Sequence, residues 1–286
     1  MDDAVPHFSF KLCADDFALS PGVSKGILLA LAAGRLTATS VMANQPDWPV
    51  SAPLLQPYRA SAEIGLHLNL TLGRPLTAMP GFAPFGHFPP LAQVIRGSIL
   101  RTLPEQEIRA EIAAQLATFI RYWGGPPDFV DGHQHVQGLP QISDYLLEEL
   151  AKHQLPKGFW LRHSADHLTS ILARKMEWPK ALIVTSLTAS FARKAKQAGF
   201  ALNEGFAGFS SFKADGSYAK GFASYLTSPG PQHLIMCHPG IPDDALRNLE
   251  DVVESRQQEL DFLLSPQFET VLQKAGAELK TKNPAH

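Results

Sequence analysis

Residues able to bind a metal ion or carry protons gather in four short clusters of this sequence. The clusters are Asp15-Asp16, His67 with Asn69, Asp131-Gly-His133-Gln-His135, and His238-Pro-Gly240. Imidazole and carboxylate together suit Zn²⁺ and other first-row divalent ions, and two histidines with one aspartate leave coordination positions open. A single histidine on a strand is more often a hydrogen-bonded core residue. A catalytic metal site therefore requires that the fold bring these clusters together.

The pattern of residues leaves individual roles open. His133 and His135 are two positions apart, so both share one face if the strand continues through them. Spacing favours His133 as the metal ligand, with His135 as a residue that supports a ligand or contacts the substrate. Asp131 is an alternative ligand, or it orients a histidine. The neighbouring carboxylates of Asp15 and Asp16 point in different directions, which lets one bind metal while the other acts on water. The alternative for either aspartate is a cap on the following helix.

Short strands that end at the clusters would position them. Residues 8–13 predict a strand that delivers the acidic pair to its tip. Residues 63–70 alternate, so their leucines and isoleucine share one face while Gly65, His67 and Asn69 share the other. Further strands are predicted at 37–42, 129–131, 158–162, 181–184, 204–209 and 233–237.

Helices are predicted between most of these strands. The first begins with Ser20 as N-cap and Pro21 at the first helical position, and it ends before Gly34. A second amphipathic helix is predicted over 108–123. About seven or eight alternating units without a linker favour a single closed or nearly closed β/α barrel over residues 1–286. In such a barrel the carboxyl ends of the strands meet at one face, so the four clusters would converge.

Two segments fall outside this alternation. Residues 72–101 are rich in Gly, Pro and Phe without a clear period, which predicts a long substrate-side loop. The polar tail over residues 280–286 is predicted to be disordered.

Composition excludes several classes of protein. The chain has 286 residues, 45% of them hydrophobic, and a net charge of -2, which argues against nucleic-acid binding. We find no apolar run of about 18 residues, so no membrane partner is expected. The acidic N-terminus lacks a signal-peptide pattern and Cys13 and Cys237 are too few for a disulfide framework, so a cytoplasmic protein with two free thiols is expected. The sequence does not decide the oligomeric state, and a homodimer is one of the alternatives.

Five motifs distributed along the chain resemble those of the YdjC-like carbohydrate deacetylases, most closely the chito-oligosaccharide deacetylase type. The motifs are Ala14-Asp-Asp-Phe17 with Leu19-Ser20, Thr39-Ser-Val-Met-Ala-Asn44, Gly65-Leu-His-Leu-Asn-Leu-Thr71, Asp131-Gly-His-Gln-His-Val136 and Met236-Cys-His-Pro-Gly240. The resemblance covers residues 8–264. It implies a TIM-like β/α barrel with about seven regular strands, and an enzyme that removes acetyl groups from N-acetylglucosamine-containing oligosaccharides.

The resemblance also implies roles for particular residues. Asp16, His67 and His133 would bind one divalent metal ion, either Mg²⁺ or Zn²⁺, with Co²⁺ and Ni²⁺ as further candidates. Asp15 would be the general base and His238 the acid.

Four more residues are predicted to contact the substrate, a small N-acetylated sugar: Asn69, His135, Arg162 and Asp131. The alternative for Arg162 is a surface ion pair. One departure from the family pattern is Gln137, where members commonly have a histidine, and this change bears on a substrate contact or on the support of a metal ligand rather than on the metal ligands themselves.

Two other functions remain as alternatives. One is a metal-dependent barrel hydrolase of phosphoesters or cyclic amides, because Asp/His sites on barrels serve many chemistries. The other is a sugar-binding protein without catalysis, which the complete set of candidate catalytic residues disfavours.

Overall fold

Parallel strands form the centre of the fold, and the computed structural model describes residues 7–282. Within that range eight strands pair in the order β6-β5-β4-β3-β2-β1-β8-β7, every pair parallel. Their bounds are β1 Phe8–Phe17, β2 Ala38–Val41, β3 Glu63–Leu68, β4 Phe129–Gly132, β5 Trp160–Leu161, β6 Ala201–Leu202, β7 Phe206–Ala207 and β8 Leu234–Cys237. A further strand, β9 (Ala277–Leu279), pairs with the first residues of β1. All carboxyl ends in the path therefore lie at one edge.

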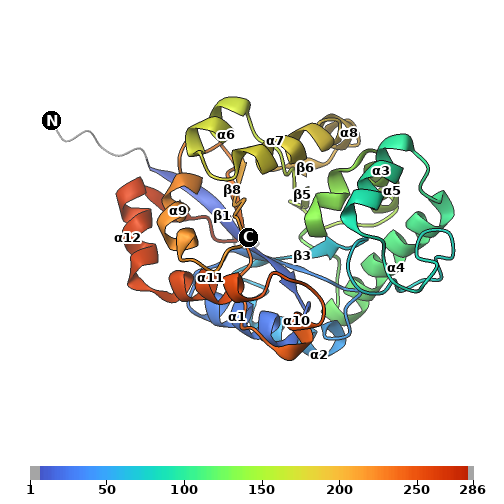
Figure 1. Cartoon of the computed structure of the whole chain (residues 1–286), viewed down its shortest axis with the longest axis horizontal. Coiled ribbons are helices and arrows are strands. Elements are labelled where there is room, and N and C mark those ends of the chain that lie inside the picture. Colours follow the sequence, from blue (N-terminus) through green and yellow to red (C-terminus); the bar gives the residue numbers. More distant parts are fainter. Residues whose placement is uncertain (1–6, 283–286) are drawn as a thin grey trace.

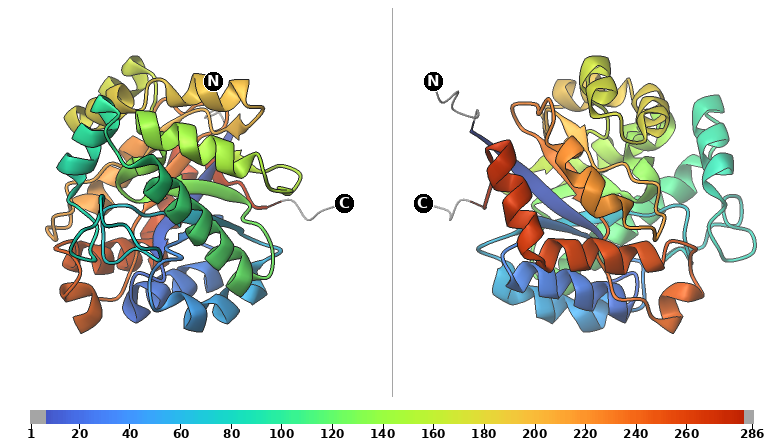
Figure 2. Two further views of the ribbon diagram at one scale, coloured as in Figure 1. Left: turned by 90° about the vertical axis from the view of Figure 1, so that its right-hand side faces the viewer. Right: turned by 60° about the vertical axis from the view of Figure 1, so that its left-hand side comes forward.

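The strands form the TIM-like barrel that the sequence predicted, with helices around them (Figure 1, Figure 2). The path holds eight strands rather than about seven, because β6 and β7 are separate two-residue strands. These two strands end the path and do not pair with each other in the described residues. The barrel is therefore incompletely closed at this point.

The helices cover the outside of the barrel, with α1 and α2 below, α11 and α12 to one side and α6 to α8 above in Figure 1. The longer helices are α1 Pro21–Ala32, α2 Trp48–Leu55, α3 Leu91–Leu100, α4 Glu105–Trp123, α5 Pro140–Leu150, α7 Trp178–Leu187, α9 Ser217–Tyr225, α11 Glu254–Leu264 and α12 Pro266–Ala275. Shorter ones are α6 Leu168–Arg174, α8 Phe191–Gln197, α10 Asp244–Arg247 and the 3₁₀ turns η1 Gln56–Tyr58 and η2 His133–Gly138. Among residues 7–282, every helix is too short or too polar to cross a bilayer.

The ends of α1 match their sequence signals. Ser20 is the N-cap and its side chain accepts a hydrogen bond from the Val23 amide, while Pro21 occupies the first turn. Gly34 follows the helix with a φ of 68°, the left-handed conformation that favours glycine. The predicted helix over 108–123 is confirmed as the C-terminal part of α4.

The strand predicted over 181–184 is wrong, because these residues lie within α7. A short apolar run does not distinguish a strand from a helix by its period. Here Pro179 lies in the first turn of the helix, where its missing amide costs nothing. The error matters for function because α7 lines the cavity described below.

The alternating face of β3 is arranged as predicted. Ile64, Leu66 and Leu68 pack in the large hydrophobic core shared with the helices. On the other face Gly65 lies against the ring of Phe129, where an added Cβ would approach ring atoms to 2.5 Å. The Phe129 ring stacks on Trp160 with 4.4 Å between ring centroids, so aromatic side chains fill the barrel.

The segment 72–101 is only partly a loop, since α3 occupies its last residues. The irregular part is fixed by two glutamates of α4. Glu111 accepts hydrogen bonds from the amides of Leu76 and Thr77, and Glu107 accepts from Gly81 and Phe82. These bonds satisfy backbone donors that a free loop would leave to water.

The first residues of the polar tail make hydrogen bonds to β1 and to the residue before β4. The amide of Lys280 donates to Phe10 O, and Lys282 Nζ donates to the Asp128 carboxylate at 2.8 Å. Residues 283–286 lie outside the described range.

Cys13 and Cys237 lie on the neighbouring strands β1 and β8. Both are buried free thiols, as predicted. The Cys237 thiol donates to the Cys13 carbonyl at 3.4 Å, so the two residues contact each other without a covalent bond.

Candidate metal centre and active site

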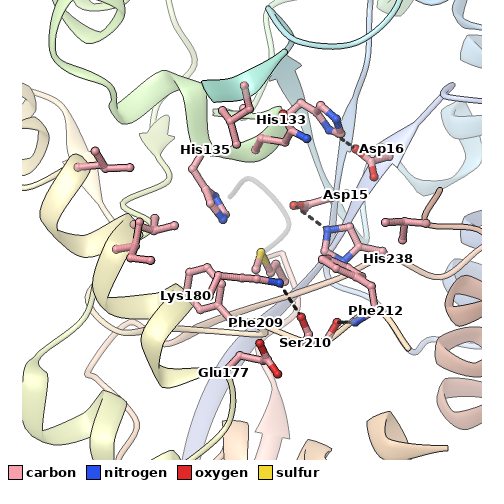
Figure 3. Close-up of a pocket in the computed structure, with 18 of the residues that line it drawn as sticks. Asp15, Asp16, His133, His135, Glu177, Lys180, Phe209, Ser210, Phe212 and His238 are labelled. Carbon is pink, nitrogen blue, oxygen red and sulfur yellow. Dashed lines mark hydrogen bonds and ion pairs between the residues drawn. The ribbon is translucent and has the colours of Figure 1, made fainter. Parts of the chain in front are cut away.

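The acidic pair near the end of β1 forms the middle of the candidate site. Asp15 and Asp16 are both buried, and Asp16 has a φ of 72°, in the left-handed region that non-glycine residues rarely adopt. The neighbouring carboxylates therefore point to different partners, as Figure 3 shows. Asp16 contacts His67 and His133. Asp15 forms an ion pair with Arg162.

Asp16, His67 and His133 bring three potential metal ligands together. Asp16 Oδ1 lies 3.1 Å from His67 Nε2 and 3.1 Å from His133 Nδ1. The ligand atoms of the three residues all lie within 4.8 Å of one another. One carboxylate and two imidazoles fit Zn²⁺ or another first-row divalent ion by donor type, and they leave positions for water and substrate.

The backbone after β4 separates His133 from His135. Gln134 and His135 have φ values of 53° and 63°, so the strand does not continue and the two histidines do not share a face. The His135 ring instead packs edge-on against Phe206 and Phe209. Only His133 of this pair joins the metal-ligand cluster.

Asp131 contacts the ring nitrogen of His67 that faces away from Asp16. Its Oδ1 accepts a hydrogen bond from His67 Nδ1 at 2.7 Å, and Ser40 Oγ lies 3.0 Å from the same nitrogen. This arrangement leaves His67 Nε2 pointing at Asp16. Burial alone would lower the pKa of His67, but the carboxylates of Asp131, Asp16 and Asp15 together outweigh burial and raise the pKa to about 10. Carboxylates commonly fix a metal-binding histidine in this way.

The second oxygen of Asp16 is held by Arg256, which the sequence analysis did not identify. Arg256 Nη2 donates to Asp16 Oδ2 at 2.7 Å and also contacts Glu250. Arg256 is buried on α11 together with Glu259, three residues later on the same helical face. Charged residues at helical spacing on the face that also carries Leu260 and Leu263 are the signal that could have indicated it.

Arg162 has a different position from the one predicted. It is 0% exposed, and its Nη1 and Nη2 donate to the two carboxylate oxygens of Asp15, both at 2.6 Å. Arg162 Nη2 also lies 2.6 Å from Asp131 Oδ2. The prediction of a contact with a sugar hydroxyl or phosphate is therefore corrected, since both ends of the guanidinium are occupied and no solvent reaches them.

This ion pair sets the charge on Asp15. Burial alone would raise the pKa of Asp15, but Arg162, together with His67 and His238, outweighs burial and lowers the pKa to about 2. The carboxylate is therefore ionised throughout the neutral range. Cys13, Asp15 and Asp131 also form a compact group of potential metal ligands, yet the guanidinium of Arg162 already binds both of its carboxylates.

Asn69 and Asp131, predicted to contact substrate, are also fully buried. Asn69 Nδ2 donates to Asn44 Oδ1 and Leu72 O, and its Oδ1 accepts from the amides of Thr71 and Leu72. Asn69 thus shapes the turn after β3. Both predictions are corrected, because neither side chain lies on the cavity wall.

Gln137 likewise lies away from the cavity. It is buried, and its Nε2 donates to the Arg162 carbonyl and to Ser164 Oγ, both at 3.2 Å. The departure from the family histidine therefore affects the support of the β5 end.

His238 follows β8 and faces Asp15 across the cavity (Figure 3). Its Nε2 lies 3.9 Å from Asp15 Oδ2, and its backbone amide donates to Glu259 Oε2 at 2.6 Å. The Phe212 ring packs edge-on against the imidazole at 5.1 Å between centroids. Burial lowers the pKa of His238 to about 4, so the resting side chain is neutral.

A cavity of about 590 Å³ opens beside these residues. Asp15, Asp16, His67, His133, His135 and His238 all line it. Burial lowers the pKa of His135 to about 3, so this histidine is neutral as well. The remaining wall comes mainly from α3, α7 and the segment after β7.

The fold and the site define a β/α-barrel protein with an Asp-His-His donor set at the carboxyl edge of its strands. The family model described as YdjC-like protein matches residues 10–274, and the chain belongs to this family. The resemblance found in the motifs is thereby confirmed.

Relatives and a solved structure match nearly the whole chain. A chitooligosaccharide deacetylase of Yersinia pestis (strain Pestoides F) is 30% identical over 269 residues, covering 93% of this chain and 94% of the relative. That of strain Angola is 29% identical over the same coverage. A structure from Enterococcus faecalis V583, provisionally named for cellobiose-phosphate cleavage, covers 96% of this chain and 97% of its own with a TM-score of 0.72 at 20% identity. The two chains share a fold.

Proposed function

We propose that this protein is a divalent-metal-dependent carbohydrate N-deacetylase. It hydrolyses the N-acetyl group of an N-acetylglucosamine-containing oligosaccharide and releases acetate. The observation that carries the proposal is the donor set of Asp16, His67 and His133 beside the arginine-held carboxylate of Asp15, all on one cavity wall. The name of the Yersinia relatives supports the same reaction and substrate class.

Asp16, His67 and His133 would hold one divalent ion, for which Zn²⁺ and Mg²⁺ are the first candidates and Co²⁺ and Ni²⁺ the next. Arg256 binds Asp16 Oδ2, so Oδ1 is the oxygen left for the ion. When bound, such an ion polarises an acetyl carbonyl and favours deprotonation of water.

Asp15 accepts the proton of the attacking water. Its carboxylate stays ionised because Arg162 binds both oxygens, and the same bonds fix its direction towards the cavity. Arg162 is thus a positioning residue for the base. It keeps the base from turning towards Asp16, whose charge is needed for the ion.

His238 delivers a proton to the departing amine nitrogen, which leaves poorly as an anion. Because the resting imidazole is neutral, this proton must arrive during the reaction. Asp15 Oδ2 lies 3.9 Å from His238 Nε2, so the proton taken from water has a short route to the imidazole. His135, the other neutral histidine of the wall, remains the proposed contact to the sugar.

A cytoplasmic site of action goes with this proposal, since both cysteines are free thiols, as in reducing compartments.

The proposal is tested by incubating the metal-loaded protein with N,N′-diacetylchitobiose, its phosphate and longer chito-oligosaccharides, and by assaying acetate. Acetate release from at least one of these sugars is the expected result. A phosphomonoester and a cyclic amide serve as comparison substrates. Turnover of either one, with no acetate from any sugar, would replace the deacetylase with another barrel hydrolase.

A further inference from the structure

A second cavity, of about 700 Å³, lies near the carboxyl ends of β1 and β2. It is a groove between the start of α2, the short helix α10 and the loop that follows β3 (Figure 1). Its volume is within the range of small-molecule sites, roughly 300 to 1,000 Å³. The mechanism proposed above uses none of the residues that line this groove.

The groove and the cavity of the candidate metal centre are separated by one short segment. Leu249 lines the groove, and the next residue, Glu250, lines the cavity. Glu250 also accepts hydrogen bonds from Arg256, the residue that holds Asp16. A ligand bound at the metal centre therefore reaches the groove by crossing this segment.

The side chain of Gln45 gives the clearest sign of a ligand in the groove. It is only 5% exposed, and its Nε2 has no hydrogen-bond partner among residues 7–282. Gly73 leaves room beside this amide, since an added Cβ would lie 3.1 Å from Nε2. A buried donor without a partner costs free energy, so such groups are normally satisfied by water or by a ligand.

The charged and polar groups of the groove suit a neutral ligand. Arg74 and Asn248 have exposed side chains that donate to no other group in the described part of the chain. Asp47 lies on the same lining, where its Oδ2 accepts a hydrogen bond from Ser24 Oγ at 2.7 Å. The opposite charges of Arg74 and Asp47 offset each other, which favours hydroxyl and amide groups over an ion.

The rest of the lining is apolar in part. Val50, which is 73% exposed, and Leu249 offer aliphatic surface beside the amides. A sugar ring combines hydroxyl groups at its edge with C–H groups on its faces. Amide and guanidinium donors next to aliphatic side chains match both parts of such a ring.

We propose that the groove binds the sugar rings of an oligosaccharide that continue beyond the N-acetylated ring at the metal centre. Gln45 Nε2 and the Arg74 guanidinium donate to oxygens of these rings, while Val50 and Leu249 contact their C–H faces. The inference rests on the proposed deacetylase function and specifies a substrate longer than a disaccharide.

The test compares methyl N-acetyl-β-D-glucosaminide with tetra-N-acetylchitotetraose as substrates. Two or more additional hydrogen bonds should raise kcat/KM for the tetrasaccharide by about tenfold or more, through KM. Equal kcat/KM per acetyl group for the two substrates would overturn the inference. So would calorimetric binding of inorganic phosphate that Arg74→Ala abolishes and the tetrasaccharide does not displace, because the groove would then be an anion site.

Two variants of the groove test the assignment of its residues. Gln45→Leu keeps the size of the side chain and removes the amide, and it breaks no hydrogen bond of Nε2 within residues 7–282. It should lower the ratio of kcat/KM for the tetrasaccharide to that for the methyl glycoside by about threefold or more. Arg74→Ala, at an exposed position where folding is not at risk, should lower the same ratio.

Gln257→Leu is the matched control for the loss of an amide. Gln257 lies on α11, donates to Asp261 and lines neither the groove nor the cavity. The ratio should therefore stay at the value of the natural protein. An unchanged ratio in both groove variants, or an equal fall in Gln257→Leu, would contradict the assignment.

Calorimetric binding of the same two sugars keeps this inference separable from the proposed function. Absence of acetate from every sugar would end the proposed function. Tetrasaccharide binding about tenfold tighter than methyl glycoside binding, weakened by Gln45→Leu and not by Gln257→Leu, would still support the groove. Acetate release without any preference for the longer chain would end this inference alone.

Discussion

Arg162 and Asp15 are joined by two parallel hydrogen bonds, each 2.6 Å long, inside the barrel. A planar guanidinium suits a carboxylate in this geometry, and Arg162 is fully buried while Asp15 keeps a small exposed part at the cavity. The same guanidinium contacts Asp131, which orients the metal-ligand candidate His67. One cation therefore connects the proposed base with the proposed metal centre.

Replacement of this arginine by lysine should separate positioning from charge. Arg162→Lys keeps the charge but loses the fork, so kcat should fall by about 10- to 100-fold with little change in KM. Steady-state kinetics of acetate release measure this effect. The matched control is Arg174→Lys, because Arg174 is buried in an ion pair with Asp166 and does not line the cavity. An equal loss of kcat in both variants would mean that the effect is structural.

Removal of the charge on the proposed base should abolish most activity without loss of the metal. Asp15→Asn should lower kcat by about 10²- to 10⁴-fold, because the amide cannot accept the water proton. Metal content by mass spectrometry and kinetics of acetate release check both parts. Full activity with normal metal content would remove Asp15 from the mechanism.

Removal of the Asp131 carboxylate, which contacts His67 Nδ1, should weaken metal binding. Asp131→Asn should raise the metal Kd by about 10- to 100-fold, since the negative charge that orients the imidazole and makes it basic is gone. Competition with a metal-binding dye measures the Kd. Asp128→Asn is the control at the approach to the same strand, where Asp128 pairs with Lys282 away from the site. Unchanged affinity in Asp131→Asn would contradict its orienting role.

Glu259 makes stability depend on pH. Burial raises the pKa of Glu259 from 4.5 to about 7, so between these values the unfolded chain has released a proton that the folded protein keeps. Stability therefore falls as pH rises through this interval, and the loss is complete above it. The gap corresponds to about 3 kcal/mol.

Glu259→Gln removes this titration while its amide oxygen can still accept the His238 amide hydrogen bond. The variant should unfold at a higher temperature than the natural protein at about pH 8, and the difference should vanish near about pH 4.5. Calorimetric unfolding of the metal-free proteins checks this. A variant less stable at both pH values would show that the charge is compensated in the folded state.

The sequence was informative where chemistry lies at strand ends. The β/α alternation placed Asp15, Asp16, His67 and His238 at one edge, because parallel strands share a direction. The spacing of His133 and His135 favoured His133 as the ligand but did not show that the strand ends between them, since the positive φ values after β4 are decided by the fold.

The roles of residues that hold the candidate base or a candidate metal ligand in place were not predictable from the sequence. The sequence predicts a substrate contact for Arg162, because an arginine at a strand end gives no sign of whether its partner is a buried carboxylate of the protein or a bound substrate. Arg256 lies on α11, 240 positions from Asp16, whose carboxylate it binds. The apolar run at 181–184 carried no period that separates strand from helix, so the α7 wall of the cavity was missed.

The most direct test of a metal-dependent deacetylase measures acetate and free amine together from N,N′-diacetylchitobiose. The metal-loaded protein should release the two products in equal amounts, release neither after treatment with a chelator, and recover when Zn²⁺ is restored. His67→Ala, which removes one donor, should neither bind Zn²⁺ stoichiometrically nor recover. Equimolar product formation that chelation leaves unchanged, or its absence from every N-acetylated sugar tried with the metal-loaded protein, would contradict the account.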